Sequence, residues 1–207
     1  LFIGASHIEH TYPFVKKYND FYNVYYLTKG GCFLTASMEN PKWSCDNIKN
    51  VGKFLEIVRP VKIVTSYYAL DGYLPDNESK KDSTLKNRIL EYGKVLKEFS
   101  SVAQNVYILT EDPRSKKFDP KVIARTGTSL KIPVEDIINS YHLHNKALNE
   151  IDLAENIEII RPIEYLCSRF CEARSLDGDF YFKDSNHFRP WYAQKVMSYL
   201  SPIIKPN

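Results

Sequence analysis

Hydrophobic positions along the chain form five short apolar runs, separated by stretches with helical periodicity. The runs are rich in β-branched and aromatic residues and are bounded by Gly, Pro, Asn or Asp, a pattern typical of buried strands. We expect the five strands at residues 1–5, 23–28, 61–67, 105–110 and 157–160. The first run breaks abruptly at Gly-Ala-Ser, which predicts a tight turn at its carboxyl end.

Apolar residues outside these runs recur every three to four positions, which predicts amphipathic helices. Helices are expected over about 7–18, 46–59, 83–99 and 134–153, within 162–171, and from 190 onwards. Asp46 is a candidate cap for the second helix, Asp82 or Ser83 for the third, and Pro190 is a favoured first-turn residue for the last. The third helix has the clearest buried stripe, formed by Leu85, Ile89, Tyr92, Leu96 and Phe99.

The alternation of strands and helices predicts an α/β fold with a parallel sheet covered on both faces. Right-handed crossovers then predict a three-layer α/β/α sandwich with a five-stranded parallel sheet of flavodoxin-like order. Polar residues 71–82 are expected to form a loop, and residues 111–133 a long irregular connection of the kind that often lies near a site. No repeat or internal boundary is visible, so residues 1–207 are expected to form a single domain.

The composition argues against some classes of protein. The 207 residues are 43% hydrophobic and 26% charged, which is ordinary for a globular chain, and the net charge of +3 comes from scattered basic residues. Such a distribution argues against a nucleic-acid partner. No apolar run approaches the roughly 20 residues of a membrane span. The chain starts with a strand and without Met, so we expect it to be a piece of a longer protein.

Four cysteines form two sequence-local pairs, Cys32 with Cys45 and Cys167 with Cys171. Their spacing matches no common zinc site. Four free thiols in the cytosol are one interpretation. We favour two disulfides in an oxidising compartment, with which the Asn77-Glu78-Ser79 sequon agrees. No metal site and no cofactor is expected, because the rings of His142 and His144 would point apart on a helix.

Candidate chemistry lies at the two ends of the chain. Ser6 follows the first strand, and the carboxyl ends of parallel strands face the ligand crevice in open α/β sheets. Asp184 precedes His187 by three residues, close enough to orient the imidazole as a general base for a serine. Taken singly, Ser6 could be a helix cap and Asp184 could cap a turn. The elbow motif of α/β-hydrolases is absent, because Ile8 replaces its second glycine.

Taken together, Gly4-Ala5-Ser6-His7 and Asp184-x-x-His187 resemble the SGNH (GDSL-like) hydrolase superfamily. The similarity is greatest to the SGNH domain fused to acyltransferase type 3 membrane proteins, over nearly the whole chain. The resemblance implies Ser6 as nucleophile, His187 as base and Asp184 as the residue that orients it. It also implies an acylated carbohydrate or other small acyl ester as substrate, and an upstream transmembrane acyltransferase domain in the same chain.

The expected oxyanion hole departs from the superfamily pattern. Its donors would be the backbone N–H groups of Ser6 and of Gly31, with Gly30 as the alternative glycine. The third block, Thr65-Ser66-Tyr67-Tyr68, lacks the usual Asn, so the hydroxyl of Ser66 or Tyr67 would replace it. Ala5 stands where the superfamily has Asp or Asn.

The resulting hypothesis is serine-dependent hydrolysis or transfer of O-acyl groups, such as acetyl, on carbohydrate. The domain would lie on the extracellular or lumenal side of a membrane. One alternative is a catalytically inert carbohydrate-binding or regulatory domain on the same scaffold, favoured by Ala5 and by the missing Asn. Another is a free secreted esterase or lipase, which would have only a signal peptide upstream.

Overall fold

The computed structural model describes all residues except 33, 35–50, 68–77, 128–130 and 206–207. The described chain forms two compact units, and it passes between them several times. The sheet unit contains Leu1–Glu9, Val24–Thr110 and His142–Ile160. The second unit contains His10–Asn23, Glu111–Tyr141 and Arg161–Asn207. That the two units form one domain, as the sequence predicts, stays a prediction.

The sheet unit is built on five parallel strands in the order β2-β1-β3-β4-β6. Their bounds are Phe2–Gly4 for β1, Tyr26–Thr28 for β2, Lys62–Ser66 for β3, Asn105–Leu109 for β4 and Ile157–Ile160 for β6. Each lies within the residues predicted as a strand. The flavodoxin-like order and the mixed α/β class are therefore confirmed.

Apolar side chains cover both faces of the central strands. All three residues of β1 are buried, as are the last four residues of β3 and of β4. The rings of Phe2 and Tyr26, which face each other in register, stack with centroids 4.8 Å apart. Burial on both faces explains why these strands read as continuous apolar runs rather than alternating ones.

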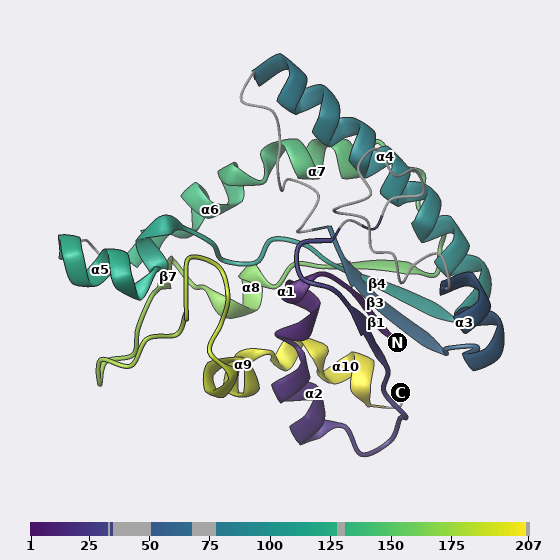
Figure 1. Cartoon of the computed structure of the whole chain (residues 1–207), viewed down its shortest axis with the longest axis horizontal. Coiled ribbons are helices and arrows are strands. Elements are labelled where there is room, and N and C mark those ends of the chain that lie inside the picture. Colours follow the sequence, from purple (N-terminus) through teal and green to yellow (C-terminus); the bar gives the residue numbers. More distant parts are fainter. Residues whose placement is uncertain (33, 35–50, 68–77, 128–130, 206–207) are drawn as a thin grey trace. The chain divides into compact units, whose positions relative to one another are not determined.

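Four helices belong to the sheet unit within the described residues: α1 (Ser6–Glu9), α3 (Val51–Val58), α4 (Glu78–Val102) and α7 (His142–Leu148). In Figure 1, α4 and α7 lie above the strands and α1 lies below them. The predicted stripe on α4 is buried at all five positions.

The start of α4 differs from the prediction. The predicted caps at Asp82 and Ser83 are wrong, because α4 begins at Glu78. The Ser83 hydroxyl instead donates back to the Lys80 carbonyl inside the helix. Residues 78–82 are therefore helical, although the sequence predicted a loop there. The cap predicted at Asp46, for the preceding helix, lies outside the described residues.

Two predicted helices are each divided. The stretch 7–18 forms α1 and then α2 (Tyr12–Tyr18), which starts so that Pro13 falls in its first turn, where a missing N–H costs nothing. The stretch 134–153 forms α6 (Val134–Ser140) and α7, separated at Tyr141. The Tyr141 hydroxyl donates to the carbonyl of Asp112, and its ring is fully buried. Tertiary packing of one aromatic side chain thus ends a helix that the periodicity alone would continue.

The second unit also contains short elements that the sequence did not predict. Residues 111–133, expected to be irregular, hold a 3-10 helix, η4 (Lys116–Phe118), the helix α5 (Pro120–Thr126) and the strand β5 (Lys131–Pro133). Asp119 caps α5, and Gly127 ends it with φ of 58°. Strand β5 pairs antiparallel with β7 (Phe170–Glu172).

Further helices complete the second unit: α8 (Ile163–Leu166), α9 (Pro190–Val196), the 3-10 helix η5 (Ser198–Leu200) and α10 (Ser201–Ile204). Pro190 opens α9 as predicted. The disulfide between Cys167 and Cys171, which joins the end of α8 to β7, is confirmed. Cys32 is also a disulfide cysteine, but its predicted partner Cys45 lies outside the described residues, so that pairing stays a prediction. No helix in the described part of the chain is long and apolar enough to cross a membrane.

Candidate active site

The serine half of the candidate site begins at the end of β1. Gly4 has φ of +149°, and a Cβ there would lie 2.9 Å from the Cγ1 of Ile8, so only glycine fits this sharp turn. Ser6 is the first residue of α1, and the Ile8 N–H donates to the Ala5 carbonyl to close the first turn. The side chains of Ala5 and His7 are buried, whereas Ser6 is partly exposed. The turn therefore presents Ser6 at the carboxyl end of the sheet.

The two predicted oxyanion residues lie at the ends of the strands that flank β1. Gly31 follows β2 in a turn closed by the Cys32 N–H on the Lys29 carbonyl, and its φ of 69° is left-handed. Ser66 is the last residue of β3. Its hydroxyl is buried and has no hydrogen-bond partner among the described residues. Since β1 lies between β2 and β3, Ser6, Gly31 and Ser66 share one edge of the sheet.

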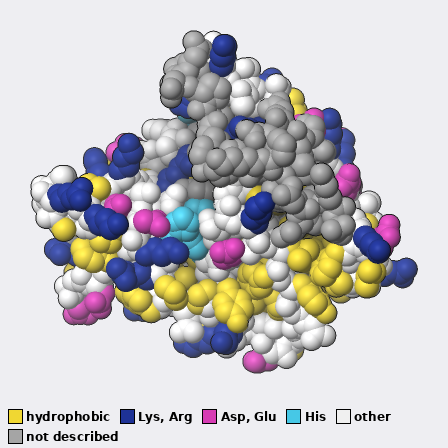
Figure 2. Space-filling view, viewed as in Figure 1, with side chains coloured by type: hydrophobic (Ala, Val, Ile, Leu, Met, Phe, Trp, Pro, Cys, Tyr) yellow, Lys and Arg dark blue, Asp and Glu magenta, His cyan; other side chains and the backbone are white. Residues whose placement is uncertain are grey.

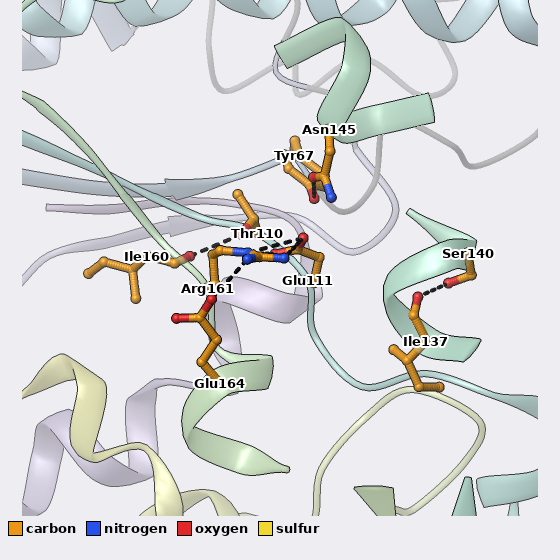
Figure 3. Close-up of polar contacts among 9 residues, drawn as sticks. All are labelled: Tyr67, Thr110, Glu111, Ile137, Ser140, Asn145, Ile160, Arg161 and Glu164. Atoms are coloured by element: carbon orange, nitrogen blue, oxygen red, sulfur yellow. Dashed lines mark hydrogen bonds and ion pairs between the residues drawn. The ribbon is translucent and has the colours of Figure 1, made fainter. Parts of the chain in front are cut away.

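Tyr67, the other candidate hydroxyl donor, is already engaged. Its ring is fully buried, and its hydroxyl donates to Oδ1 of Asn145 on α7 over 3.0 Å, as Figure 3 shows. The ring of His144 stacks on Tyr67 with centroids 5.2 Å apart. No motif in the sequence pointed to Asn145. With the Tyr67 proton committed to Asn145, Ser66 is the better candidate for a donor.

The base half of the candidate site is a compact turn in the second unit. Oδ1 of Asp184 accepts the backbone N–H of Asn186 over 3.1 Å and that of His187 over 2.8 Å. The Nδ1 atom of the His187 ring lies 2.9 Å from Oδ1 and 2.8 Å from Oδ2 of Asp184. Both interpretations of the motif hold at once, because Asp184 caps the turn and also orients the ring. A carboxylate only accepts, so Nδ1 carries the proton and Nε2 is the acceptor of the neutral ring.

The ring of His10 packs against this turn. The ring of His10 meets that of His187 edge-on with centroids 4.8 Å apart, and it also contacts Phe188 at 5.9 Å. His10 is buried, and the Lys183 N–H donates to the His187 carbonyl over 2.8 Å. The sequence carries no signal at His10, because a ring contact between residues so far apart along the chain leaves no local pattern.

The hydrogen bonds around Asp184 affect its titration. Burial raises the pKa of the Asp184 carboxyl. The backbone N–H groups of Asn186 and His187 and the His187 ring lower that pKa by a larger amount, so the net pKa lies below its ordinary value. A carboxyl with a depressed pKa in the folded state stabilises the fold above its unfolded pKa. That contribution is lost as the pH falls through the folded pKa.

We therefore expect Asp184→Asn to lower the stability at neutral pH, with a difference from wild type that shrinks as the medium becomes acidic. Urea unfolding midpoints measured from about pH 7 down to about pH 3 would record this trend, since the unfolded pKa is about 4. Asp177→Asn, an exposed change in the same unit, is the matched control. A difference between Asp184→Asn and wild type that does not vary with pH would contradict the assignment.

The predicted site residues thus fall into two groups. Ser6, Gly31 and Ser66 belong to the sheet unit, whereas Asp184 and His187 belong to the second unit. The structure brings together the residues within each group. Across the described residues, no group of three His, Cys, Asp or Glu side chains could hold a metal ion.

Comparison with protein families identifies the chain. The family model described as "SGNH domain (fused to AT3 domains)" matches residues 1–202. The chain belongs to this family. Because the match runs almost from end to end, it assigns almost the entire chain to a family of SGNH domains that are fused to AT3 domains, which supports an acyl-related function.

A solved structure agrees with this assignment at the level of the fold. The structure of this chain is similar to that of the periplasmic domain of a lipopolysaccharide acetyltransferase from Salmonella ser. Paratyphi A, with a TM-score of 0.66 and 15% sequence identity. The match covers 99% of this chain and 83% of the other. The comparison with curated protein sequences finds no match to this chain.

Proposed function

We propose that Ser6, His187 and Asp184 act as a catalytic triad that hydrolyses or transfers O-acyl groups. His187 would take the Ser6 proton through Nε2 as the hydroxyl attacks the acyl carbonyl, and Asp184 would hold the ring in the required tautomer. The carboxylate–imidazole geometry of Asp184 and His187 carries this proposal. Family membership supports it, because the domain is of the SGNH type.

Chain connectivity gives independent support for a meeting of Ser6 and His187. Only four peptide links separate Ser6 from His10, a span of about 15 Å even if fully extended. The His10 ring lies against the His187 ring. Ser6 is therefore close along the chain to the residue that contacts the base, which supports the proposal that Ser6 and His187 act together.

The oxyanion hole would consist of the backbone N–H groups of Ser6 and Gly31 and the Ser66 hydroxyl. Their common edge of the sheet supports this set, as does the Ser66 hydroxyl, which lacks a partner among the described residues. A donor that is buried without a partner is costly unless it serves a ligand or transition state. This arrangement would compensate for the missing Asn of the third block.

We expect Ser66→Ala to lower kcat by about 100- to 1000-fold with little change in KM, because an oxyanion donor acts mainly in the transition state. Steady-state kinetics on an aryl acetate would measure this. Ser101→Ala, on the exposed side of α4, provides a control for a lost hydroxyl elsewhere. A loss of less than about threefold would remove Ser66 from the oxyanion hole.

The substrate would be an O-acylated carbohydrate, with an acetyl group as one candidate, handled on the extracytoplasmic side of a membrane. The structural neighbour is a periplasmic domain of an acetyltransferase, and the Cys167–Cys171 disulfide suits an oxidising compartment. The upstream part of the parent chain would then be a transmembrane acyltransferase domain. A parent with only a signal peptide would instead make this a free esterase.

Fluorophosphonate labelling of the folded domain tests the proposal directly, because the probe reacts with an activated serine. We expect labelling at Ser6, together with turnover of short aryl or sugar acetates. The inert alternative, which Ala5 and the missing Asn favour, expects a folded domain that neither labels nor turns over any ester. Labelling at another serine would reject Ser6 as the nucleophile.

A further inference from the structure

A surface of the second unit combines exposed aromatic rings with lysines. It lies on α2, on the residue stretch just after it and on α9, and α2 and α9 pack against each other. We call it the lysine–aromatic surface, and it consists of Tyr12, Lys16, Lys17, Phe21, Trp191 and Lys195. The exposed fractions of its rings are 49% for Tyr12, 60% for Phe21 and 43% for Trp191. In Figure 2, hydrophobic side chains gather over the lower part of the view, and Lys or Arg side chains stand among them.

The two helices present the same pairing of residue types. Tyr12 precedes Lys16 by four positions on α2, and Trp191 precedes Lys195 by four positions on α9. Side chains four apart share one helix face, so each ring and its lysine lie on the same side of their helix. The Lys16 Nζ atom is 5.9 Å from the centre of the Tyr12 ring. The buried sides of the helices hold other residues, such as Phe14 and Ala193, so the exposed pairs are not required for the core.

Acidic residues are scarce in the same segments, so their scattered basic residues are not balanced. Residues 10–23 and 188–207 together contain five Lys or Arg and a single acidic residue, Asp20. Their formal charge of +4 exceeds the +3 of the entire chain, so the rest of the molecule is slightly acidic. The positive charge therefore does not result from a generally basic protein. It belongs to the elements that carry the lysine–aromatic surface.

We propose that the lysine–aromatic surface binds the headgroup region of an anionic phospholipid bilayer. Tyr and Trp favour the membrane–water interface, and lysines extend over apolar surface while their ammonium groups reach anionic headgroups. Protein–protein interfaces are depleted in lysine, so the combination suits a bilayer better than a protein partner. The family is described as fused to AT3 domains, and the resemblance to acyltransferase type 3 membrane proteins implies that such a domain would lie in a membrane close to this surface.

The binding would also affect where the candidate site works. Tyr12 and Trp191 follow His10 and His187 by two and four residues, so the surface adjoins the base half of the site. Docking would hold that half at the bilayer, where a lipid-linked acceptor or donor would be found. This consequence rests on the proposed function, whereas the binding itself does not.

Co-sedimentation of the 207-residue chain with lipid vesicles tests the proposal. We expect binding to vesicles of phosphatidylcholine with about one-third phosphatidylglycerol, weak binding to pure phosphatidylcholine, and loss of binding as salt rises from about 0.1 to 0.5 M. The triple variant Lys16→Gln, Lys17→Gln, Lys195→Gln should bind about 100-fold more weakly, since each lysine near an anionic surface contributes about fivefold. The matched control neutralises three exposed lysines elsewhere, Lys53, Lys97 and Lys121, and should lose far less.

A fluorescence readout identifies the surface that makes the contact. The sequence has two tryptophans, so Trp43→Phe leaves Trp191 as the single reporter. Its emission should shift to the blue on binding, and lipids brominated near the headgroup should quench it more than lipids brominated deep in the chain. Circular dichroism melting checks that every variant is folded.

Several outcomes would overturn the proposal. They are no binding to anionic vesicles, an equal loss in both triple variants, or a Trp191 spectrum that does not change. Binding to a purified membrane acyltransferase domain with none to vesicles would assign the surface to a protein partner instead.

Discussion

Replacing Ser6 with alanine is expected to lower the turnover of an O-acyl ester by on the order of 10⁴- to 10⁶-fold, because the substitution removes the oxygen that attacks the carbonyl. His187→Ala should cost about as much, since an unassisted serine hydroxyl is a poor nucleophile. The double variant should be little worse than either single one, because the two residues act as one unit. Single-turnover and steady-state assays on an aryl acetate would measure these losses.

Matched variants separate this effect from damage to the fold. Ser101→Ala and His142→Ala remove the same functional groups at exposed positions outside the candidate site and should keep nearly full turnover. Turnover that survives Ser6→Ala would reject the mechanism. Additive losses in the double variant would show that Ser6 and His187 do not work together.

The sheet was predictable because its strands are buried on both faces. A continuous apolar run such as residues 61–67 has few other places in a globular chain, and right-handed crossovers then restrict the strand order. The breaks in helices were less predictable. Tyr141 interrupts a helical pattern through a hydrogen bond to Asp112, which lies 29 residues earlier in the chain. Such contacts depend on the packed structure and leave no periodic signal.

The residues of the candidate site also differ in whether the sequence could indicate them. Asp184 and His187 interact over three residues, so their spacing in the sequence is enough to indicate the pair. Ser6 is marked by the glycine that ends β1. His10 and Asn145 could not be found in this way, because each meets its partner through tertiary packing. The sequence thus predicts the residues with local signatures and misses those that support them.

Arg161→Met is expected to destabilise the second unit by about 3 kcal/mol, near the lower end of the range for breaking a buried ion pair. The carboxylate of Glu111 is 1% exposed. It accepts two parallel hydrogen bonds from the Arg161 guanidinium, from Nε to Oε2 over 3.0 Å and from Nη2 to Oε1 over 2.8 Å, as Figure 3 shows. Arg161 is 39% exposed, so water offsets part of its loss, which favours the lower end of the range. Thermal and urea unfolding would record the change.

Two further variants separate the buried pair from its exposed extension. Arg161 also donates to Glu164 over 2.9 Å, but that carboxylate is 56% exposed, so Glu164→Gln should cost less than about 1 kcal/mol. The double variant Glu111→Met, Arg161→Met should recover most of the stability lost in Arg161→Met, because it removes the stranded buried charge. If the double variant were as unstable as the single one, the cost would lie in lost packing of the arginine stem rather than in the unpaired carboxylate. The ion pair would then be a consequence of the fold rather than a condition for it.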